Sequence, residues 1–245
     1  MSTYGKFIEE TLKAEYNSIC ILKNEESSKI EVFQHKTNNN KLVKILSKNR
    51  NDHIYREIRG LKQENLPIIL DVCSCEEYLL ILESYVDGEP LNTIIEKQEL
   101  SPGNVVSYIL DICNALNFLH KKNIIHRDVK PGNIIITPEK RAVLVDFSAA
   151  RFISEGQQKD TANLGTVGYA APEQFGIYQS LPPTDIYALG VMFNEMLTKL
   201  HPSIKTPSGK LGKIIKKCTD TQISKRYQTI DSLIADLKRY QKFHK

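Results

Sequence analysis

Three short motifs in the second half of this 245-residue chain restrict its fold more than any other feature. Residues 126–133 read His-Arg-Asp-Val-Lys-Pro-Gly-Asn, residues 146–148 read Asp-Phe-Ser, and residues 171–173 read Ala-Pro-Glu. The first motif places a carboxylate, a cation and an amide on one loop, and the second brings another carboxylate to the end of an apolar run. Such groups, in this order and spacing, suit a phosphoryl group held on Mg²⁺.

The composition is that of an ordinary soluble globular protein, with 41% apolar and 25% charged residues. The apolar runs are too short to span a bilayer, and the first residues lack the apolar core of a signal peptide. Five scattered cysteines argue against a disulfide framework and indicate a reducing cytoplasm. From Lys205 onward, eleven Lys or Arg face three Asp. We interpret this basic stretch as a solvated helix face and expect no nucleic-acid partner, although nucleic acid or anionic lipid is the alternative.

The first third of the chain has the pattern of a small sheet. Residues 18–46 alternate like three strands, and two further strands are predicted near residues 68–73 and 78–83. A helix is predicted over Arg56–Lys62. Five strands and one helix make a small α+β unit.

A run of turn formers, Asp87-Gly88-Glu89-Pro90, is the predicted hinge between residues 1–86 and residues 87–245. Beyond it the apolar pattern is mostly helical. Ser101-Pro102 suits the start of a helix, and Thr229 suits the start of the last one.

With these elements, the three motifs resemble those of the eukaryotic-like protein kinases, on their Ser/Thr branch. The resemblance extends from about Tyr16 to Tyr240, and the stretch from Gly165 to Phe175 looks like bacterial members of the family. It implies a bilobal α+β fold, with a five-stranded antiparallel sheet and one helix in the small N-lobe (1–86) and a larger, mainly helical C-lobe (87–245).

The resemblance assigns chemical roles within the first two motifs. Asp128 is the implied catalytic base, which accepts or orients the proton of the attacking hydroxyl, and Lys130 steadies the transferring phosphate. Asn133 and Asp146 are the implied Mg²⁺ ligands. Ser148 replaces the family's usual glycine but leaves the metal ligand intact.

ATP is the implied second cofactor. Lys44 resembles the strand lysine that contacts the α and β phosphates, and Glu57 resembles its ion-pair partner, because a buried lysine needs one to stay charged. The segment from Glu83 through Tyr85 resembles the part whose backbone binds adenine. Glu89 fits either a ribose contact or an exposed turn.

One family hallmark, the glycine-rich loop between the first two strands, is missing. Glu25-Glu26-Ser27-Ser28 lies in its place. Two glutamates there would repel a triphosphate by about 1 kcal/mol each. Lys23 or Lys29 would offset part of this, and the amides of Ser27 and Ser28 are candidates for binding phosphate oxygens.

Phosphorylation is expected to order the polar stretch before Glu173. Thr161 is the preferred site and Ser154 the second, whereas Thr166 is expected to contact Asp128 and Lys130.

Scaffold roles are expected for three further residues. Glu173 should pair with Arg226, and Asp185 should brace the catalytic loop from a buried helix. The chain after Leu200 is short where the family often has a substrate-docking helix, so the substrate cannot be taken from familiar relatives.

Three functions follow from these patterns. The first is an Mg·ATP-dependent Ser/Thr protein kinase that acts on protein hydroxyls and on itself. The second is a nucleotide-binding pseudokinase or regulatory module with weak or no transfer activity, which the missing glycines favour. The third transfers phosphate to a small molecule, against which Lys130 and the Ala-Pro-Glu motif argue.

Overall fold

The computed structural model describes residues 3–49, 51–153, 166–175 and 179–243. The chain divides between Val86 and Asp87 into two compact units. In the described residues, no helix is both long and apolar enough to cross a membrane.

The first unit contains a five-stranded antiparallel sheet in the order β1-β2-β3-β5-β4. All five strands were expected from the alternation of apolar residues. Their bounds are β1 (Tyr16–Asn24), β2 (Ser28–His35), β3 (Lys41–Ser47), β4 (Ile69–Ser74) and β5 (Leu79–Ser84).

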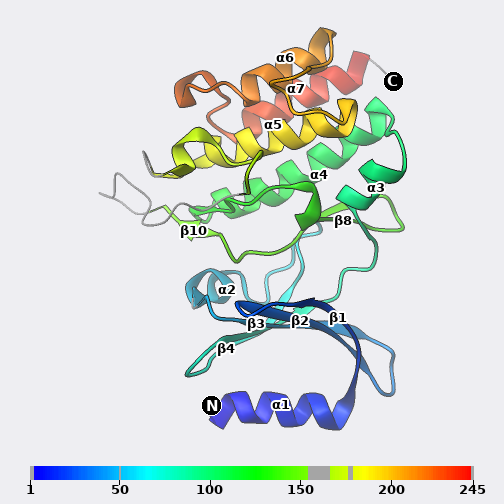
Figure 1. The fold of residues 1–245 in the computed structure, drawn as a ribbon, viewed down its shortest axis with the longest axis vertical. Coiled ribbons are helices and arrows are strands. Elements are labelled where there is room, and N and C mark those ends of the chain that lie inside the picture. The colour runs from blue at the N-terminus through cyan, green and yellow to red at the C-terminus, as the bar shows by residue number, and fades with distance from the viewer. Residues whose placement is uncertain (1–2, 50, 154–165, 176–178, 244–245) are drawn as a thin grey trace. The chain divides into compact units, whose positions relative to one another are not determined.

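Two helices, rather than the expected one, pack on this sheet. Helix α1 (Thr3–Glu15) lies on one face and helix α2 (Asp52–Ile58) on the other (Figure 1). The predicted bounds of α2, Arg56–Lys62, are therefore wrong. Tertiary contacts set its start, because Arg56 and Ser74 both hydrogen-bond the Asp52 carboxylate. Its end is followed by Gly60, whose φ of 71° is left-handed.

Helix α1 is amphipathic and contributes to the core of the first unit. Its Ile8 and Leu12 join a buried cluster with strand residues that include Phe33, Leu42 and Leu80. Its C-terminal end is capped by Lys36, whose ammonium donates to the carbonyls of residues 13 and 14 at 3.0 and 2.6 Å. The helix is thus held at its middle by apolar packing and at its end by a cation.

The second unit is built around helix α4 (Pro102–His120), which begins where Ser101-Pro102 predicted it, with the Ser101 hydroxyl accepting the Asn104 amide at 3.2 Å. Its inward face is fully buried, and each large aliphatic side chain there contributes about 1.5–3 kcal/mol. The surrounding helices are α3 (Leu91–Lys97), α5 (Pro182–Thr198), α6 (Gly209–Cys218) and α7 (Ile230–Phe243).

Short strands hold the loops of the second unit. Strand β8 pairs with β6 and β9, and β7 pairs with β10. Their bounds are β6 (Glu89–Pro90), β7 (Ile124–Ile125), β8 (Ile134–Ile136), β9 (Ala142–Leu144) and β10 (Arg151–Phe152), and short 3-10 turns are η1 (Pro131–Asn133), η2 (Pro172–Phe175) and η3 (Ile223–Lys225). The connection from α5 to α6 contains no helix in described residues 199–208, as its short length predicted.

Candidate active site

The loop that carries the first motif follows β7 and leads into η1, and helix α5 holds it in place. The carboxylate of Asp185, which is fully buried, accepts the backbone amides of His126 at 2.9 Å and Arg127 at 2.8 Å. The Nε2 atom of His120 lies 2.8 Å from the same carboxylate. Burial alone would raise the pKa of Asp185, but these hydrogen bonds and the nearby histidine hold it below its usual value. The expected bracing role of Asp185 is confirmed.

Two residues of this region have left-handed backbones although neither is glycine. Arg127 has a φ of 70° and Asp146 a φ of 68°. Such conformations cost about 1–3 kcal/mol each and persist only where the surroundings enforce them. The Asp185 hydrogen bond to the Arg127 amide is one such constraint.

Asp128 is the centre of a hydrogen-bond network. Its Oδ1 accepts the Thr166 hydroxyl at 2.7 Å, and its Oδ2 lies 2.8 Å from the Lys130 ammonium. The same ammonium donates to the Thr166 hydroxyl at 2.7 Å. The expected contacts of Thr166 with Asp128 and Lys130 are therefore confirmed.

The network keeps Asp128 ionised. Burial alone would raise the pKa of Asp128, but hydrogen bonds from Lys130 and Thr166 and the charge of Lys130 outweigh burial and lower that pKa. A carboxylate in this state accepts hydrogen bonds at neutral pH and cannot donate one.

Asn133 and Asp146 lie at the same end of the β8–β9 ladder. The carbonyl of Asn133 accepts the Val145 amide at 2.9 Å, directly before Asp146. The Asn133 Nδ2 donates to the backbone oxygen and to Oδ2 of Asp128, at 2.8 and 2.9 Å. This orientation leaves the Asn133 Oδ1 for a cation.

These two oxygen donors fit Mg²⁺, which binds through one or two protein groups and completes its shell with phosphate oxygens and water. Among the described residues, no three His, Cys, Asp or Glu side chains form an all-protein metal site. The donor set of Asn133 and Asp146 thus suits a metal that arrives with phosphates.

A buried ion pair connects the third motif to the helical core. Arg226 contacts both carboxylate oxygens of Glu173, at 2.7 and 2.9 Å, and the Thr184 hydroxyl donates to the same carboxylate at 2.9 Å. Both charged side chains are at most 2% exposed. The expected Glu173–Arg226 pair is confirmed.

Gln174 also positions the catalytic loop, and sequence reasoning missed it. Its Nε2 donates to the Arg127 carbonyl at 2.8 Å, and its Oε1 accepts the Ala171 amide at 3.0 Å. Its place directly after Ala-Pro-Glu was the available signal, but nothing local indicated that partner.

The predicted pair between Lys44 and Glu57 is wrong. Within the described ranges, the carboxylates within 4.0 Å of the Lys44 ammonium belong to Glu9 of α1, at 3.3 Å, and Glu31 of β2, at 4.0 Å. The reason is the alternation of side chains in β3. Lys44 shares a face with Leu42, which packs against α1, whereas α2 and its exposed Glu57 lie on the other face (Figure 1).

The turn that replaces the glycine-rich loop is a closed hairpin. The Ser28 amide donates to the Glu25 carbonyl at 3.3 Å, so in this conformation it is engaged within the turn. The glutamates of the turn are paired, Glu25 with Lys23 at 3.2 Å and Glu26 with Lys48 at 2.8 Å. This pairing weakens the expected repulsion of a triphosphate.

The remaining predicted residues lie as follows. Glu83 is buried on β5, and half-buried Tyr85 follows that strand with the Lys41 ammonium 5.0 Å above its ring. Glu89 pairs with Lys97. The phosphorylation candidates Thr161 and Ser154 lie outside the described residues.

The stability of this region is expected to fall on mild acidification because of His126. Burial lowers the pKa of this fully buried imidazole, against the opposing charges of Asp185, Asp146 and Asp128. In the unfolded chain this histidine has a pKa of about 6.5, so between that pH and the lower pKa of the folded state the unfolded chain binds more protons than the folded one. Over this window the free energy of unfolding falls by up to ~1.4 kcal/mol for each unit that the pH is lowered. Urea unfolding at pH 7.5 and 5.5 measures this.

The variant His126→Phe keeps an aromatic ring at this position but removes the group that binds the proton. The stability of the variant should therefore change less between the two pH values than that of the wild type. Equal changes in the two proteins would contradict the assignment to His126.

Comparisons with known proteins agree with this geometry. The family model "Protein kinase domain" matches residues 24–241. A probable serine/threonine-protein kinase of Clostridium perfringens is 31% identical over 211 residues, which cover 76% of this chain and 31% of that protein. Serine/threonine-protein kinase PknB of Mycobacterium tuberculosis is 32% identical over 186 residues, which cover 65% of this chain and 30% of PknB.

The chain thus spans less than a third of these relatives. The family match includes the catalytic loop, both metal-ligand candidates and the buried scaffold pair, and it confirms the expected α+β fold. The names of the two relatives confirm the resemblance to the Ser/Thr branch. This chain belongs to the protein kinase domain family.

Proposed function

We propose that this domain is a Ser/Thr protein kinase that transfers the γ-phosphoryl group of Mg·ATP to Ser or Thr hydroxyls of proteins, including its own. The observation that carries the proposal is the network of Asp128, Lys130, Thr166 and Asn133. It keeps a carboxylate ionised beside a lysine and a metal-ligand candidate, which are the groups that phosphoryl transfer requires.

In this mechanism Asp128 accepts, or orients, the proton of the attacking hydroxyl. Lys130 places a positive charge beside that carboxylate and stabilises the negative charge of the phosphoryl group. Thr166 holds both side chains in register by accepting from Lys130 and donating to Asp128. Asn133 and Asp146 would hold Mg²⁺, which would neutralise part of the negative charge of the phosphates.

For nucleotide binding we propose the backbone from Glu83 through Tyr85 as the adenine contact. Its support is that, among the described residues, the Tyr85 amide makes a single long hydrogen bond, 3.5 Å to the Lys41 carbonyl. Ser27 remains a candidate phosphate contact. The ammonium of Lys44 is committed to Glu9, with its side chain 9% exposed, so it reaches a phosphate only if that pair opens.

We expect Lys44→Met to change stability more than ATP affinity. Removing the ammonium takes the cation from the Glu9 carboxylate beside the apolar cluster, whereas Glu31 keeps Lys29 at 3.0 Å and Ser18 at 2.6 Å. The loss should cost about 1.5–3 kcal/mol and lower Tm by ~3–12 °C. The Kd for ATP should stay within about threefold. Differential scanning fluorimetry and a nucleotide titration measure the two quantities.

Glu9→Gln is the matched variant, because Lys44 then keeps Glu31 and the loss of stability should be smaller. Tenfold weaker ATP binding by Lys44→Met, with an unchanged Tm, would show instead that Lys44 reaches the phosphates.

The proposed activity is tested with purified protein, Mg²⁺, γ-labelled ATP and a generic basic protein, beside Asp128→Asn. We expect label on the protein substrate and on the domain itself, and none above background with the variant. ATP that stabilises the domain without transfer would support a nucleotide-binding regulatory module, and label on a small molecule alone would support the third function.

We also propose a cytoplasmic location. Its support is that all five cysteines are free thiols, of which Cys73, Cys75, Cys113 and Cys218 are buried.

A further inference from the structure

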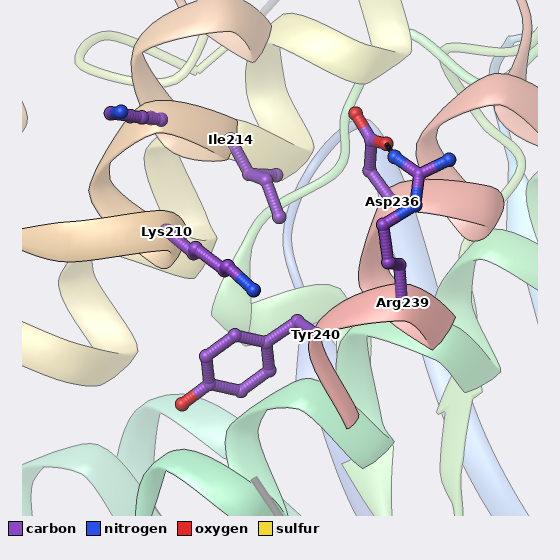
Figure 2. Close-up of a pocket in the computed structure, with 6 residues that line it drawn as sticks. Lys210, Ile214, Asp236, Arg239 and Tyr240 are labelled. Carbon is purple, nitrogen blue, oxygen red and sulfur yellow. Dashed lines mark hydrogen bonds and ion pairs between the residues drawn. The ribbon is translucent and has the colours of Figure 1, made fainter. Parts of the chain in front are cut away.

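A cavity of about 220 Å³ lies between helices α6 and α7, apart from the catalytic loop in the sequence and in the fold. It is lined by Lys210, Lys213, Ile214, Asp236, Arg239 and Tyr240. Figure 2 shows Lys210 and Ile214 reaching in from α6, and Asp236, Arg239 and Tyr240 from α7. Three cations and one carboxylate thus surround a space with an aliphatic and an aromatic wall.

The one carboxylate of this lining is already neutralised. Oδ1 of Asp236 accepts from Arg239 at 2.7 Å, and Oδ2 accepts the Tyr227 hydroxyl at 2.8 Å. In the part of the chain that the structure describes, no carboxylate lies within 4.0 Å of the ammonium of Lys210 or Lys213. Two positive charges at the cavity therefore remain uncompensated.

The surroundings increase this imbalance. The first turn of α6 contains no acidic residue, and a helix disfavours a cation such as Lys210 at that end. The ammonium of Lys210 lies 4.5 Å above the exposed ring of Phe243, a contact that leaves its charge uncompensated. An anion in the cavity would be favoured by the charges of Lys210 and Lys213 and by the N-terminal end of the helix.

We propose that this cavity binds a phosphorylated Ser or Thr side chain of a protein partner. A phosphoryl group has a charge near −2 at neutral pH, which matches the two uncompensated lysines, and three acceptor oxygens for their ammonium donors. Ile214 and Tyr240 offer apolar contact for the carbon part of the side chain. The cavity is concave and small, which suits one side chain better than the regular phosphates of a duplex or the flat surface of a membrane.

The inference deepens the proposed function and rests on it, because phosphoserine and phosphothreonine are the products of that reaction. After a partner protein has been phosphorylated once, its new phosphoserine or phosphothreonine could bind in this cavity. The helix-free connection of residues 199–208 leads directly to the α6 end of the cavity. A site here would thus favour protein substrates that already bear a phosphate.

The test is fluorescence anisotropy at 150 mM salt with a labelled phosphoserine peptide and the same peptide with unmodified serine. We expect the phosphopeptide to bind at least ~10-fold more tightly, and Lys210→Glu with Lys213→Glu to remove that difference. The matched control is Lys216→Glu with Lys225→Glu, which makes the same change in net charge at exposed positions and should leave binding within about twofold. Thermal unfolding verifies that each variant is folded.

Equal binding of the two peptides, or an unchanged difference in Lys210→Glu/Lys213→Glu, overturns the proposal. So does competition by a DNA duplex or by phosphatidylserine vesicles that is stronger than competition by unlabelled phosphopeptide. The assay contains no ATP and is repeated with Asp128→Asn, which should bind like the wild type. Loss of catalysis and loss of this binding site are therefore observed separately.

Discussion

Asp128→Asn is expected to lower kcat for protein phosphorylation by roughly a hundred- to ten-thousandfold, the range typical of a lost general base. Asparagine fits the same space. Its side-chain oxygen can accept from Lys130 and Asn133, and its NH₂ group can donate to the Thr166 hydroxyl, so the network survives without a proton acceptor. KM for ATP should change little. Steady-state kinetics with labelled ATP and a saturating protein substrate measure both.

Asp220→Asn is the matched control, because it removes a carboxylate of the same unit. Among the described residues, the hydrogen bond of that carboxylate is a local one, from the turn amide of Gln222 to Oδ1 at 2.9 Å. Its kcat should stay within about twofold of the wild type. Activity of Asp128→Asn equal to that of this control would refute the assignment of the base.

Arg226→Ala is expected to lower the free energy of unfolding by about 3–5 kcal/mol, which corresponds to roughly 6–20 °C in Tm for a chain of this size. In the part of the chain that the structure describes, the variant leaves the buried Glu173 carboxylate with the Thr184 hydroxyl as its remaining hydrogen-bond partner. The backbone carbonyls of Pro183 and Asp220 also lose their donors, at 3.1 and 2.7 Å. Urea denaturation followed by circular dichroism measures the loss.

An exposed pair in the same unit provides the comparison. Arg239 and Asp236 are also 2.7 Å apart, but their side chains are 67% and 32% exposed. Arg239→Ala should therefore cost at most ~1 kcal/mol. If the two variants lost equal stability, burial would not be the source of the Arg226 effect.

The sequence was most informative where the chemistry depends on neighbours along the chain. Asp128, Lys130 and Asn133 belong to one loop, so their proximity followed from the motif, and the contact with Thr166 followed from the family pattern. The strands were readable because alternation is local. The left-handed backbone of Arg127 could not be predicted from the local sequence, because one of the contacts that hold it comes from the buried Asp185 of a distant helix.

Long-range contacts account for the errors. The spacing of Lys44 and Glu57 matched the family pattern, but the carboxylate that reaches Lys44 comes from Glu9, 35 residues earlier in the chain. Helix α1 was not predicted because it lies before Tyr16, where the family pattern begins, although Ile8 and Leu12 are spaced for one helical face. The early start of α2 depends on Ser74 in strand β4, a contact that no local pattern indicates.

Helix α1 ends at Glu15, before the family match begins at residue 24. Truncation at the family boundary would remove Ile8, Leu12 and Glu9 together with most of strand β1. It would uncover an apolar sheet face and leave Glu31, at 4.0 Å, as the carboxylate beside Lys44. We therefore expect a fragment that starts at residue 24 to be less stable than one that includes α1. Assays of this kinase domain should therefore use a polypeptide that retains that helix.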